Sequence, residues 1–341
     1  MRVGLLFDRF GDAPRPPGAP DDWDAEYEPE ETVAALEAAL TRLGHTPVRI
    51  GNARALLAAM ARGPLSLDAA VNIAESYGSR NREAHVPVLL ELAGVPCVGS
   101  DALSLSVSLD KHLTKTVVAA AGVAVPAGGA AAPGDDVRAL AAGLAFPVIV
   151  KPRYEGTAKG ISRASRCADA DALAAEADRQ LALYGDVVVE AFVDGPEFTV
   201  GVVGTGADAG ALPPLQRAVD LASGIGIHAL DEATDDYRLD GDLSDALDAA
   251  LADAALSAHR ALDCRDFSRS DFRVGADGRP VFIEINPLPT FAPDGTFAIL
   301  AELAGQRYES FLADVLGAAL TLAVESARND SVGETANTPA A

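Results

Sequence analysis

Residues 146–161 read FPVIVKPRYEGTAKGI, and residues 281–289 read VFIEINPLP. In the first stretch, a continuous apolar run that predicts a buried strand delivers Lys151 at its end and is followed directly by a glycine-containing loop. In the second stretch, polar and apolar residues alternate, as expected for a strand with two unlike faces. Both stretches therefore predict strands of α/β domains that carry charged side chains at defined positions.

The second stretch is expected to pair with residues 267–274 in a hairpin across a glycine-rich turn. Arg269 and Asp271 are two residues apart, so both point to one side of their strand. Glu284 and Asn286 do the same on the partner strand. If the two sides coincide, two carboxylates, an amide oxygen and a guanidinium converge.

Oxygen ligands of this kind suit Mg²⁺, which is usually held by one or two carboxylates together with water and substrate phosphates. No histidine or cysteine is among them, which disfavours zinc. The alternative is a hairpin whose polar side faces solvent. Strongly apolar neighbours and the rigid Asn-Pro-Leu-Pro at 286–289 favour the metal site.

The lysines give a complementary signal. The chain has only four, Lys111, Lys115, Lys151 and Lys159, and all fall in one short segment, whereas the positive charge elsewhere is arginine. A lysine kept where arginine otherwise serves suggests a need for a compact, reorientable ammonium, as in phosphate binding. Chance clustering in a lysine-poor protein is the alternative.

The first 100 residues repeat strand, helix and strand, which predicts a small parallel-sheet domain. Strands are expected at 1–7, 46–50, 67–73 and 95–98, and helices at 29–43 and 83–93.

The rest of the chain predicts a second α/β domain and then a segment built around the hairpin. We expect helices at 106–121, 169–183, 243–262 and 308–324, and strands at 146–150, 186–191 and 197–203. Residues 205–241 contain many turn formers and no firm periodicity apart from a short strand near Ala218, so a long ligand-covering loop is predicted there. Residues 326–341 are small and polar and are predicted to be disordered.

Six stretches, in this order along the chain, resemble the D-alanine–D-alanine ligases and their close relatives in the ATP-grasp superfamily. They are VPCVGS at 95–100, LDK at 109–111 with TK at 114–115, FPVIVKPRYEGTAKGI at 146–161, VEAFVDGPEFTVG at 189–201, CRDFSRSDFRV at 264–274 and VFIEINPLP at 281–289.

The resemblance implies an α/β ATP-grasp fold, in which a small N-terminal parallel α/β domain precedes two α+β subdomains that sandwich ATP. The expected boundaries are 1–104 for the N-terminal domain, 105–190 and 191–325 for the two subdomains, and 326–341 for the tail.

The resemblance also implies roles for particular residues. The residues that are expected to bind ATP are Lys111, Lys151, Gly156, Thr157, Ala158, Lys159, Glu190, Phe192, Val193, Glu197 and Ile283. In this assignment the loop 156–160 closes over the phosphates, Glu190 and the backbone of Val193 read the adenine edge, and Glu197 binds the ribose hydroxyls. Two Mg²⁺ or Mn²⁺ ions would be held by Asp271, Glu284 and Asn286. The catalytic residues would be Arg269, which stabilises charge on the transferring phosphoryl group, and the hydroxyl-bearing Thr157.

The implied activity is an ATP- and magnesium-dependent carboxylate–amine ligase that works through an acyl phosphate and belongs to cell-wall biogenesis. Three alternatives stay open: a ligase for other amino acids in a biosynthetic pathway, a carboxylase that activates bicarbonate, and a nucleotide-binding protein without catalysis.

The resemblance is weaker in the substrate half. The Gly-Gly turn and the Glu and Ser that usually follow it are absent at the start, where acidic residues lie around the beginning of the first expected helix, at Glu26, Glu28, Glu30 and Glu31. Thr290 and Gly295 stand where the family has a Gly and a Ser near the acceptor. Glu75, Arg80 and Glu83 lie in a segment where the family shapes its first substrate site.

The composition of the chain limits the kinds of partner that we expect it to bind. The net charge of −23 would repel a phosphate backbone, so we expect no nucleic-acid partner. The chain shows no basic leader and no evident apolar run of about 18 to 20 residues, and its three cysteines form no CxxC pair. We therefore expect a cytoplasmic enzyme with small-molecule amino-acid substrates, no membrane partner and, from the resemblance, a homodimeric state.

Overall fold

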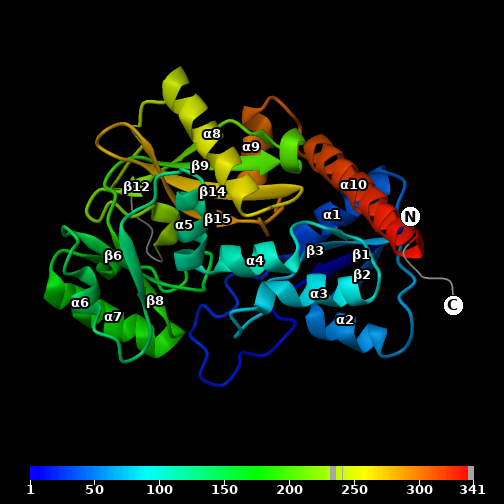
Figure 1. Ribbon diagram of the computed structural model, residues 1–341, viewed down its shortest axis with the longest axis horizontal. Helices are drawn as coiled ribbons and strands as arrows, with labels where there is room; N and C mark the ends of the chain where they lie inside the picture. Colours follow the sequence, from blue (N-terminus) through cyan, green and yellow to red (C-terminus); the bar gives the residue numbers. More distant parts are fainter. Residues whose placement is uncertain (231–235, 240, 337–341) are drawn as a thin grey trace.

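The computed structural model describes residues 1–230, 236–239 and 241–336, and in that part of the chain three sheets of four or five strands organise the fold. Each sheet is drawn from one continuous stretch of sequence, and the three occupy different regions of the molecule (Figure 1). The domain boundaries at 104, 190 and 325 remain predictions.

The first sheet is parallel with strand order β2-β1-β3-β4. Its strands are β1 (Arg2–Phe7), β2 (Thr46–Gly51), β3 (Ala69–Ile73) and β4 (Cys97–Val98). Its helices are α1 (Glu30–Arg42), α2 (Ala53–Met60), η1 (Arg82–Ala84) and α3 (His85–Leu92). The predicted strand–helix repeat is confirmed. Helix α2 was not predicted, although Leu56 is buried and Ala53 and Met60 pack beside it at helical spacing.

The helix expected at 106–121 is instead two helices, α4 (Ala102–Leu109) and α5 (Lys111–Ala120). The prediction of one helix was wrong because Asp110 leaves the helical conformation, with φ −82° and ψ 96°. Its carboxylate accepts hydrogen bonds from the backbone N–H groups of His112 and Leu113, both at 3.1 Å, and so caps the second helix. The break makes Lys111 the first residue of α5.

The second sheet has the order β5-β8-β6-β7 and is antiparallel. Its strands are β5 (Gly128–Ala131), β6 (Val148–Pro152), β7 (Arg166–Cys167) and β8 (Val187–Ala191). Helices α6 (Val137–Ala141) and α7 (Ala170–Tyr184) lie beside it, and the turn η2 (Arg163–Ser165) precedes β7 (Figure 1). The expected apolar strand begins two residues later than predicted and continues through Lys151, whose side chain is therefore fixed by the sheet.

The third sheet contains the predicted hairpin. Its order is β10-β9-β14-β15, with β11 also paired to β9. The strands are β9 (Glu197–Val203), β10 (Gly210–Ala211), β11 (Leu215–Arg217), β14 (Phe267–Val274) and β15 (Pro280–Asn286). Helix α8 (Asp245–Ala261) packs on this sheet, and α9 (Thr296–Leu303) follows the hairpin.

The region 205–241 is more regular than the predicted loop. It contains β10 and β11, a ribbon of β12 (Val219–Asp220) with β13 (Tyr237–Arg238), and the turns η3 (Gly206–Asp208) and η4 (Ile227–Ala229). The expected strand near Ala218 corresponds to the two strands on either side of it. Such short strands depend on hydrogen bonds to a partner, which local sequence does not reveal. Residues 231–235 and 240 lie outside the described part.

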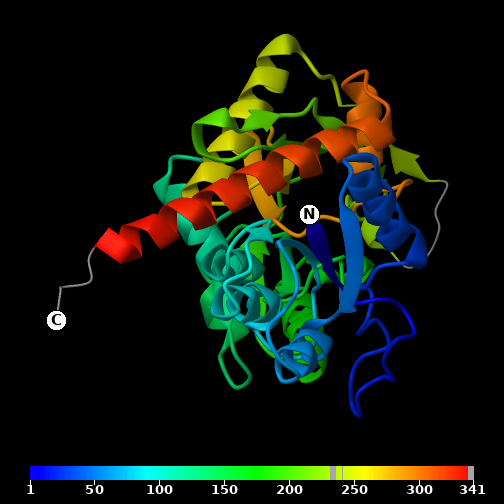
Figure 2. The same ribbon diagram turned by 90° about the vertical axis from the view of Figure 1, so that its right-hand side faces the viewer.

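Helix α10 (Tyr308–Ala336) returns to the first sheet and packs against α1 (Figure 2). The predicted disorder from residue 326 was wrong as far as Ala336, since a helix already anchored by its apolar half extends at little cost per residue; residues 337–341 lie outside the described part. Contrary to expectation, Tyr308–Arg328 is long and apolar enough to cross a bilayer, but Phe311, Leu312 and Leu316 on it belong to the main core.

Candidate active site

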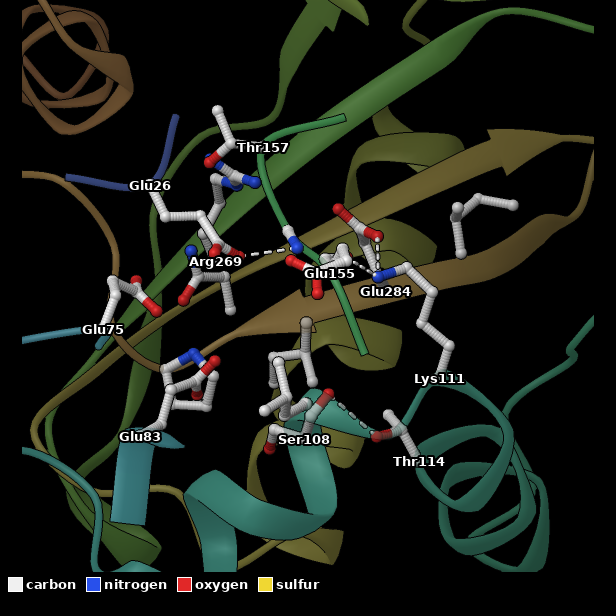
Figure 3. Close-up of a pocket in the computed structure, with 16 residues that line it drawn as sticks. Glu26, Glu75, Glu83, Ser108, Lys111, Thr114, Glu155, Thr157, Arg269 and Glu284 are labelled. Carbon is white, nitrogen blue, oxygen red and sulfur yellow. Dashed lines mark hydrogen bonds and ion pairs between the residues drawn. The ribbon is translucent and has the colours of Figure 1, made fainter. Parts of the chain in front are cut away.

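A cavity of about 440 Å³ lies between the second and third sheets. Lys151 and Glu190 line it from the second sheet, and Glu197, Asp271 and Glu284 line it from the third. A smaller cavity of about 40 Å³ adjoins it, because Lys111, Thr157, Arg269, Ile283 and Glu284 line both (Figure 3). The predicted site residues from three separate stretches of sequence therefore meet around one space.

The polar face of the hairpin forms one wall. In the antiparallel register of β14 and β15, Arg269 lies opposite Asn286 and Asp271 lies opposite Glu284. Arg269 Nη2 is 3.2 Å from Asp271 Oδ2, and the hydroxyl of Thr199 donates to Asp271 Oδ1 at 2.6 Å. The two polar sides coincide as the sequence predicted, so the alternative of a solvent-facing hairpin is wrong.

This wall fits a hard divalent cation. It presents two carboxylates and one amide oxygen, and Mg²⁺ needs few protein ligands of this type. The Asn286 Oδ1 atom also accepts the Leu288 backbone N–H at 2.7 Å, which fixes the amide orientation. Burial acts to raise the pKa of the Glu284 carboxyl, but Lys111, Lys151 and Arg269 outweigh it and lower that pKa, so the group is an anion. Among the described residues, no group of three or more His, Cys, Asp or Glu side chains is placed to hold a metal ion, and this wall itself offers two carboxylates and an amide.

Lys111 faces this wall from the start of α5. Its Nζ atom lies 3.7 Å from Glu284 Oε2 and donates to the carbonyl oxygen of Glu155. The ammonium is thus positioned between the hairpin and the loop 155–160. A triphosphate in the cavity would meet it there.

Lys151 belongs to a buried lysine–glutamate–lysine group. Glu190 Oε2 is 3.0 Å from Lys151 Nζ, and Glu190 Oε1 is 2.5 Å from Lys115 Nζ. Burial acts to raise the pKa of Glu190, but the two ammonium groups lower it to about 2. Burial lowers the pKa of Lys115 to about 8. Both Glu190 oxygens therefore already bind lysines, so its first role is to orient Lys151; contact with an adenine edge remains a prediction.

The glycine-containing loop adopts a constrained conformation. Thr157 and Ala158 have positive φ angles of 47° and 56°, in the left-handed region that residues with a Cβ seldom occupy. The N–H of Gly156 donates to Glu26 Oε1 at 2.6 Å, and the N–H of Gly160 donates to Asp22 Oδ2 at 3.0 Å. A Cβ on Gly156 would lie 2.5 Å from Glu26 Oε1, so a larger residue here would displace this carboxylate.

The side chain of Lys159 departs from the expected arrangement. Its Nζ atom lies 2.5 Å from both Glu26 Oε2 and Glu155 Oε2, and the side chain is only 1% exposed. Its ammonium therefore neutralises Glu26 and Glu155. Its backbone remains part of the loop that lines the cavity.

The opposite end of the cavity carries the predicted ribose and base residues. Glu197 Oε2 accepts a hydrogen bond from Arg273 at 2.6 Å, and Glu197 Oε1 is 3.5 Å from His228 Nε2. The guanidinium groups of Arg166 and Arg273 both lie over the ring of Phe192, with their central carbons 5.0 and 5.5 Å from its centroid. Val193 and Ile283 complete the apolar lining.

Sequence reasoning missed Arg217 and His228, which line the large cavity from the region predicted to be a loop. Arg217 donates to Thr296 Oγ1 at 2.5 Å, beside the start of α9. Neither lies in a motif, and only the pairing of β11 with β9 brings Arg217 to the site. The sequence does not distinguish Glu26 from the other three acidic residues near the first helix. The structure shows that it accepts a hydrogen bond from Gly156 of the loop.

The structure also shows where the residues lie at which the substrate half differs from the family pattern. Thr290 donates from its hydroxyl to Glu28 Oε2 at 2.9 Å, which joins the segment after the hairpin to a residue two positions before α1. Gly295 is the N-cap residue of α9 and carries no side-chain cap. Thr290, Gly295 and Thr296 all line the large cavity, so this segment faces the same space as the predicted phosphate binders.

Comparisons with known proteins agree with this geometry. The family model described as D-ala D-ala ligase C-terminus matches residues 126–317. A D-alanine–D-alanine ligase of Cupriavidus taiwanensis is 34% identical over 245 residues, which cover 71% of this chain and 73% of the relative.

Solved structures show the same fold. The D-alanine–D-alanine ligase of Bacillus anthracis complexed with ATP superposes with a TM-score of 0.71 at 21% identity, covering 95% of this chain and 99% of that one. The VanG D-Ala:D-Ser ligase of Enterococcus faecalis has a TM-score of 0.71 at 17% identity, covering 93% and 99%. The matched family model spans more than half of the chain and contains most of the cleft residues, so this protein belongs to the D-alanine–D-alanine ligase family, with the ATP-grasp fold.

Proposed function

We propose that this protein is an ATP-dependent ligase that joins the carboxylate of one amino acid to the amine of another. The observation that carries the proposal is the pairing of Arg269 and Asp271 with Asn286 and Glu284 on a wall between two adjoining cavities, the larger of which Lys111 and Lys151 also line. Binding of a triphosphate would bring these cations to its oxygens, and the cavity has room for a nucleotide-sized ligand.

The chemistry follows from the poor electrophilicity of a carboxylate. A carboxylate oxygen of the first substrate attacks the γ-phosphorus, the bond to the β,γ-bridging oxygen breaks, and ADP leaves. The amine of the second substrate then attacks the carbonyl carbon of the acyl phosphate; inorganic phosphate departs and the nitrogen loses a proton. Arg269 stabilises the negative charge that develops in both steps. Electrostatic stabilisation by preorganised donors is usually the largest single contribution to the rate enhancement of an enzyme.

We propose Mg²⁺ or Mn²⁺ as the metal, held by Asp271, Glu284 and Asn286, where it would neutralise phosphate charge. The loop 156–160 would close over the phosphates through its backbone N–H groups, with Thr157 next to the transferring group. Exclusion of water matters because the acyl phosphate would otherwise be hydrolysed.

The substrates, assembly and location are part of the proposal. Relatives named D-alanine–D-alanine ligase support D-alanine for one or both positions, and the D-Ala:D-Ser relative supports a different second amino acid. We propose a homodimer in the cytoplasm without nucleic-acid or membrane partners, consistent with the net charge of −23. Sedimentation velocity would test the dimer.

The test is magnesium-dependent phosphate release from ATP by the purified protein. It is run with D-alanine, with D-alanine plus D-serine, with pools of D- and L-amino acids, and with bicarbonate alone. Release with an amino acid, together with the condensed product in the mass spectrum, supports the ligase. Release with bicarbonate alone would favour a carboxylase, and ATP binding without release under any condition would favour a protein that only binds nucleotide.

A further inference from the structure

A separate cavity of about 160 Å³ adjoins the loop 155–160. It is lined by Pro20, by residues between β3 and α3, by the loop itself and by the end of α7. Arg80 lines this cavity and does not line the small cavity, which Glu75 and Glu83 share. None of the motifs assigns it a role, and we call it the Arg80 cavity.

The charges around the Arg80 cavity balance except for one. Arg82 lies 2.8 Å from Glu26, and Lys159 lies 2.5 Å from both Glu26 and Glu155. These two cations and two carboxylates cancel. Arg80 is exposed, and no carboxylate in the described part of the chain lies at ion-pair distance from it. One positive charge without a counter-ion therefore remains at the cavity.

The ring of Tyr154 holds the Arg80 guanidinium in place. The central carbon of this guanidinium lies 5.2 Å from the ring centroid, which is within the range of a cation–π contact. A guanidinium that lies over a ring keeps the N–H groups at its own edge free to donate. Arg80 is therefore prepared to donate two parallel hydrogen bonds to a carboxylate.

A hydroxyl group and an apolar surface complete the lining. The hydroxyl of Tyr77 has no hydrogen-bond partner among the described residues, and its ring packs edge-on against Trp23, with the centroids 5.6 Å apart. Pro20, Leu183 and the ring of Tyr184 form the apolar part. A ligand that matches this lining carries one negative charge next to an apolar body.

We propose that the Arg80 cavity is a regulatory site for a small organic monocarboxylate with an apolar body. The carboxylate accepts hydrogen bonds from Arg80 and from the Tyr77 hydroxyl, and the body packs against Pro20 and Leu183. A phosphate group brings nearly two charges and three strong acceptor oxygens, which exceeds what one guanidinium and one hydroxyl neutralise. An ammonium compound is repelled by Arg80. The inference goes beyond the ligase reaction and does not depend on its substrates.

The loop 155–160 connects this site to the large cavity. Glu155 and Lys159 line both cavities, and Tyr154, which holds Arg80, directly precedes them. A carboxylate bound to Arg80 ties the segment after β3 to the loop, so the loop has less freedom left to lose when ATP binds. By linkage, ATP and the carboxylate then strengthen the binding of each other by the same factor.

The experiment titrates benzoate, and benzamide as its uncharged counterpart, into the full chain and follows binding by NMR of the ligand. We expect a Kd for benzoate of about 1 mM or tighter, and benzamide should bind at least about tenfold more weakly. Arg80→Gln removes the cation, and Leu183→Glu adds a negative charge at a side chain that is 48% exposed. Each should weaken benzoate binding by about fivefold or more. Arg54→Gln and Leu57→Glu, at exposed positions of α2, are the matched controls and should bind as the wild type does.

The coupling is measured in the same proteins without turnover. Saturating benzoate should lower the Kd for ATP about fivefold in calorimetry and slow amide hydrogen exchange in the loop 155–160 of the wild type, and it should do neither in Arg80→Gln. Benzamide binding as tight as that of benzoate, or benzoate binding unchanged in both cavity variants, would overturn the site. Benzoate binding at the site with no change in ATP affinity or loop exchange would overturn its regulatory role.

Discussion

Asp271 on β14 lies directly opposite Glu284 on β15, in the register that also pairs Arg269 with Asn286. Two carboxylates brought together in this way repel each other unless cations lie between them. Arg269 and Lys111 supply part of that charge at 3.2 and 3.7 Å, and a divalent ion would supply the rest.

Removal of one carboxylate should therefore weaken metal binding. Asp271→Asn keeps the shape but removes one negative charge, so we expect the Mg²⁺ concentration for half-maximal activity to rise by about 10- to 100-fold. Measuring the activity of the wild type and the variant over a range of Mg²⁺ concentrations gives this half-maximal concentration. Asp277→Asn, in the exposed turn of the same hairpin, is the control, and an equal effect there would remove Asp271 from the metal site.

Arg269 should matter for the reaction more than for binding. In Arg269→Ala the nucleotide keeps its lysines and its loop, but charge that develops during phosphoryl transfer loses its donor. We expect phosphate release to fall by about 10²- to 10³-fold or more while calorimetry shows little change in ATP affinity. Arg279→Ala, on the exposed turn, should behave as wild type. Wild-type turnover in Arg269→Ala would contradict the mechanism.

Glu26 should hold the loop 156–160 in place from the N-terminal domain. Burial acts to raise the pKa of Glu26, but Arg82 and Lys159 lower it, so the group is an anion bound to the Gly156 N–H. In Glu26→Gln we expect faster amide hydrogen exchange in the loop and a KM for ATP raised by about tenfold.

The exposed Glu31, near the start of α1, provides the control Glu31→Gln. Unchanged exchange in the loop of Glu26→Gln would show that the loop does not depend on this contact.

Glu190 should be essential to stability, since it separates two buried ammonium groups. Glu190→Gln leaves Lys115 and Lys151 without their counter-ion, and we expect a loss of about 3 kcal/mol in the free energy of unfolding at pH 7. Buried lysines without a counter-ion release protons more easily, so the folded state binds fewer protons than the unfolded one and the deficit should shrink as the pH rises. Urea unfolding at about pH 7 and pH 9.5 measures both effects.

His259 should make stability depend on pH in the acid range. Its side chain is fully buried beside Ser268, with Nδ1 2.8 Å from Oγ, and burial lowers its pKa to about 4 from 6.5. Between these values the unfolded chain binds the proton and the folded chain does not, so stability falls as the pH drops below about 6.5. A pKa shift of this size corresponds to a loss of about 3 kcal/mol in the free energy of unfolding.

The measurement is urea unfolding of His259→Gln and wild type from about pH 7.5 to pH 4.5. The variant should lose less stability than the wild type across this range. His112→Gln, an exposed residue of α5, should follow the wild type. Parallel curves for His259→Gln and the wild type would contradict the assignment.

Local sequence determined the features that depend on short-range patterns. Alternation along the hairpin placed Arg269 and Asp271 on one side because successive side chains of a strand must point in opposite directions. The apolar run before Lys151 predicted a strand, and the strand–helix repeat predicted the parallel sheet. The order of the motifs along the chain predicted the family.

Tertiary structure alone decided which side chains meet across long distances. Nothing local distinguishes Glu26 from Glu28 or Glu30, yet Glu26 is the one that reaches Gly156, 130 residues away. Arg217 reaches the cleft because β11 pairs with β9, and Glu75 and Glu83 are buried beside a cavity that α4 and the hairpin segment also line. These groups acquire their chemistry from burial and from neighbours distant in the chain, and neither is encoded in a short window of sequence.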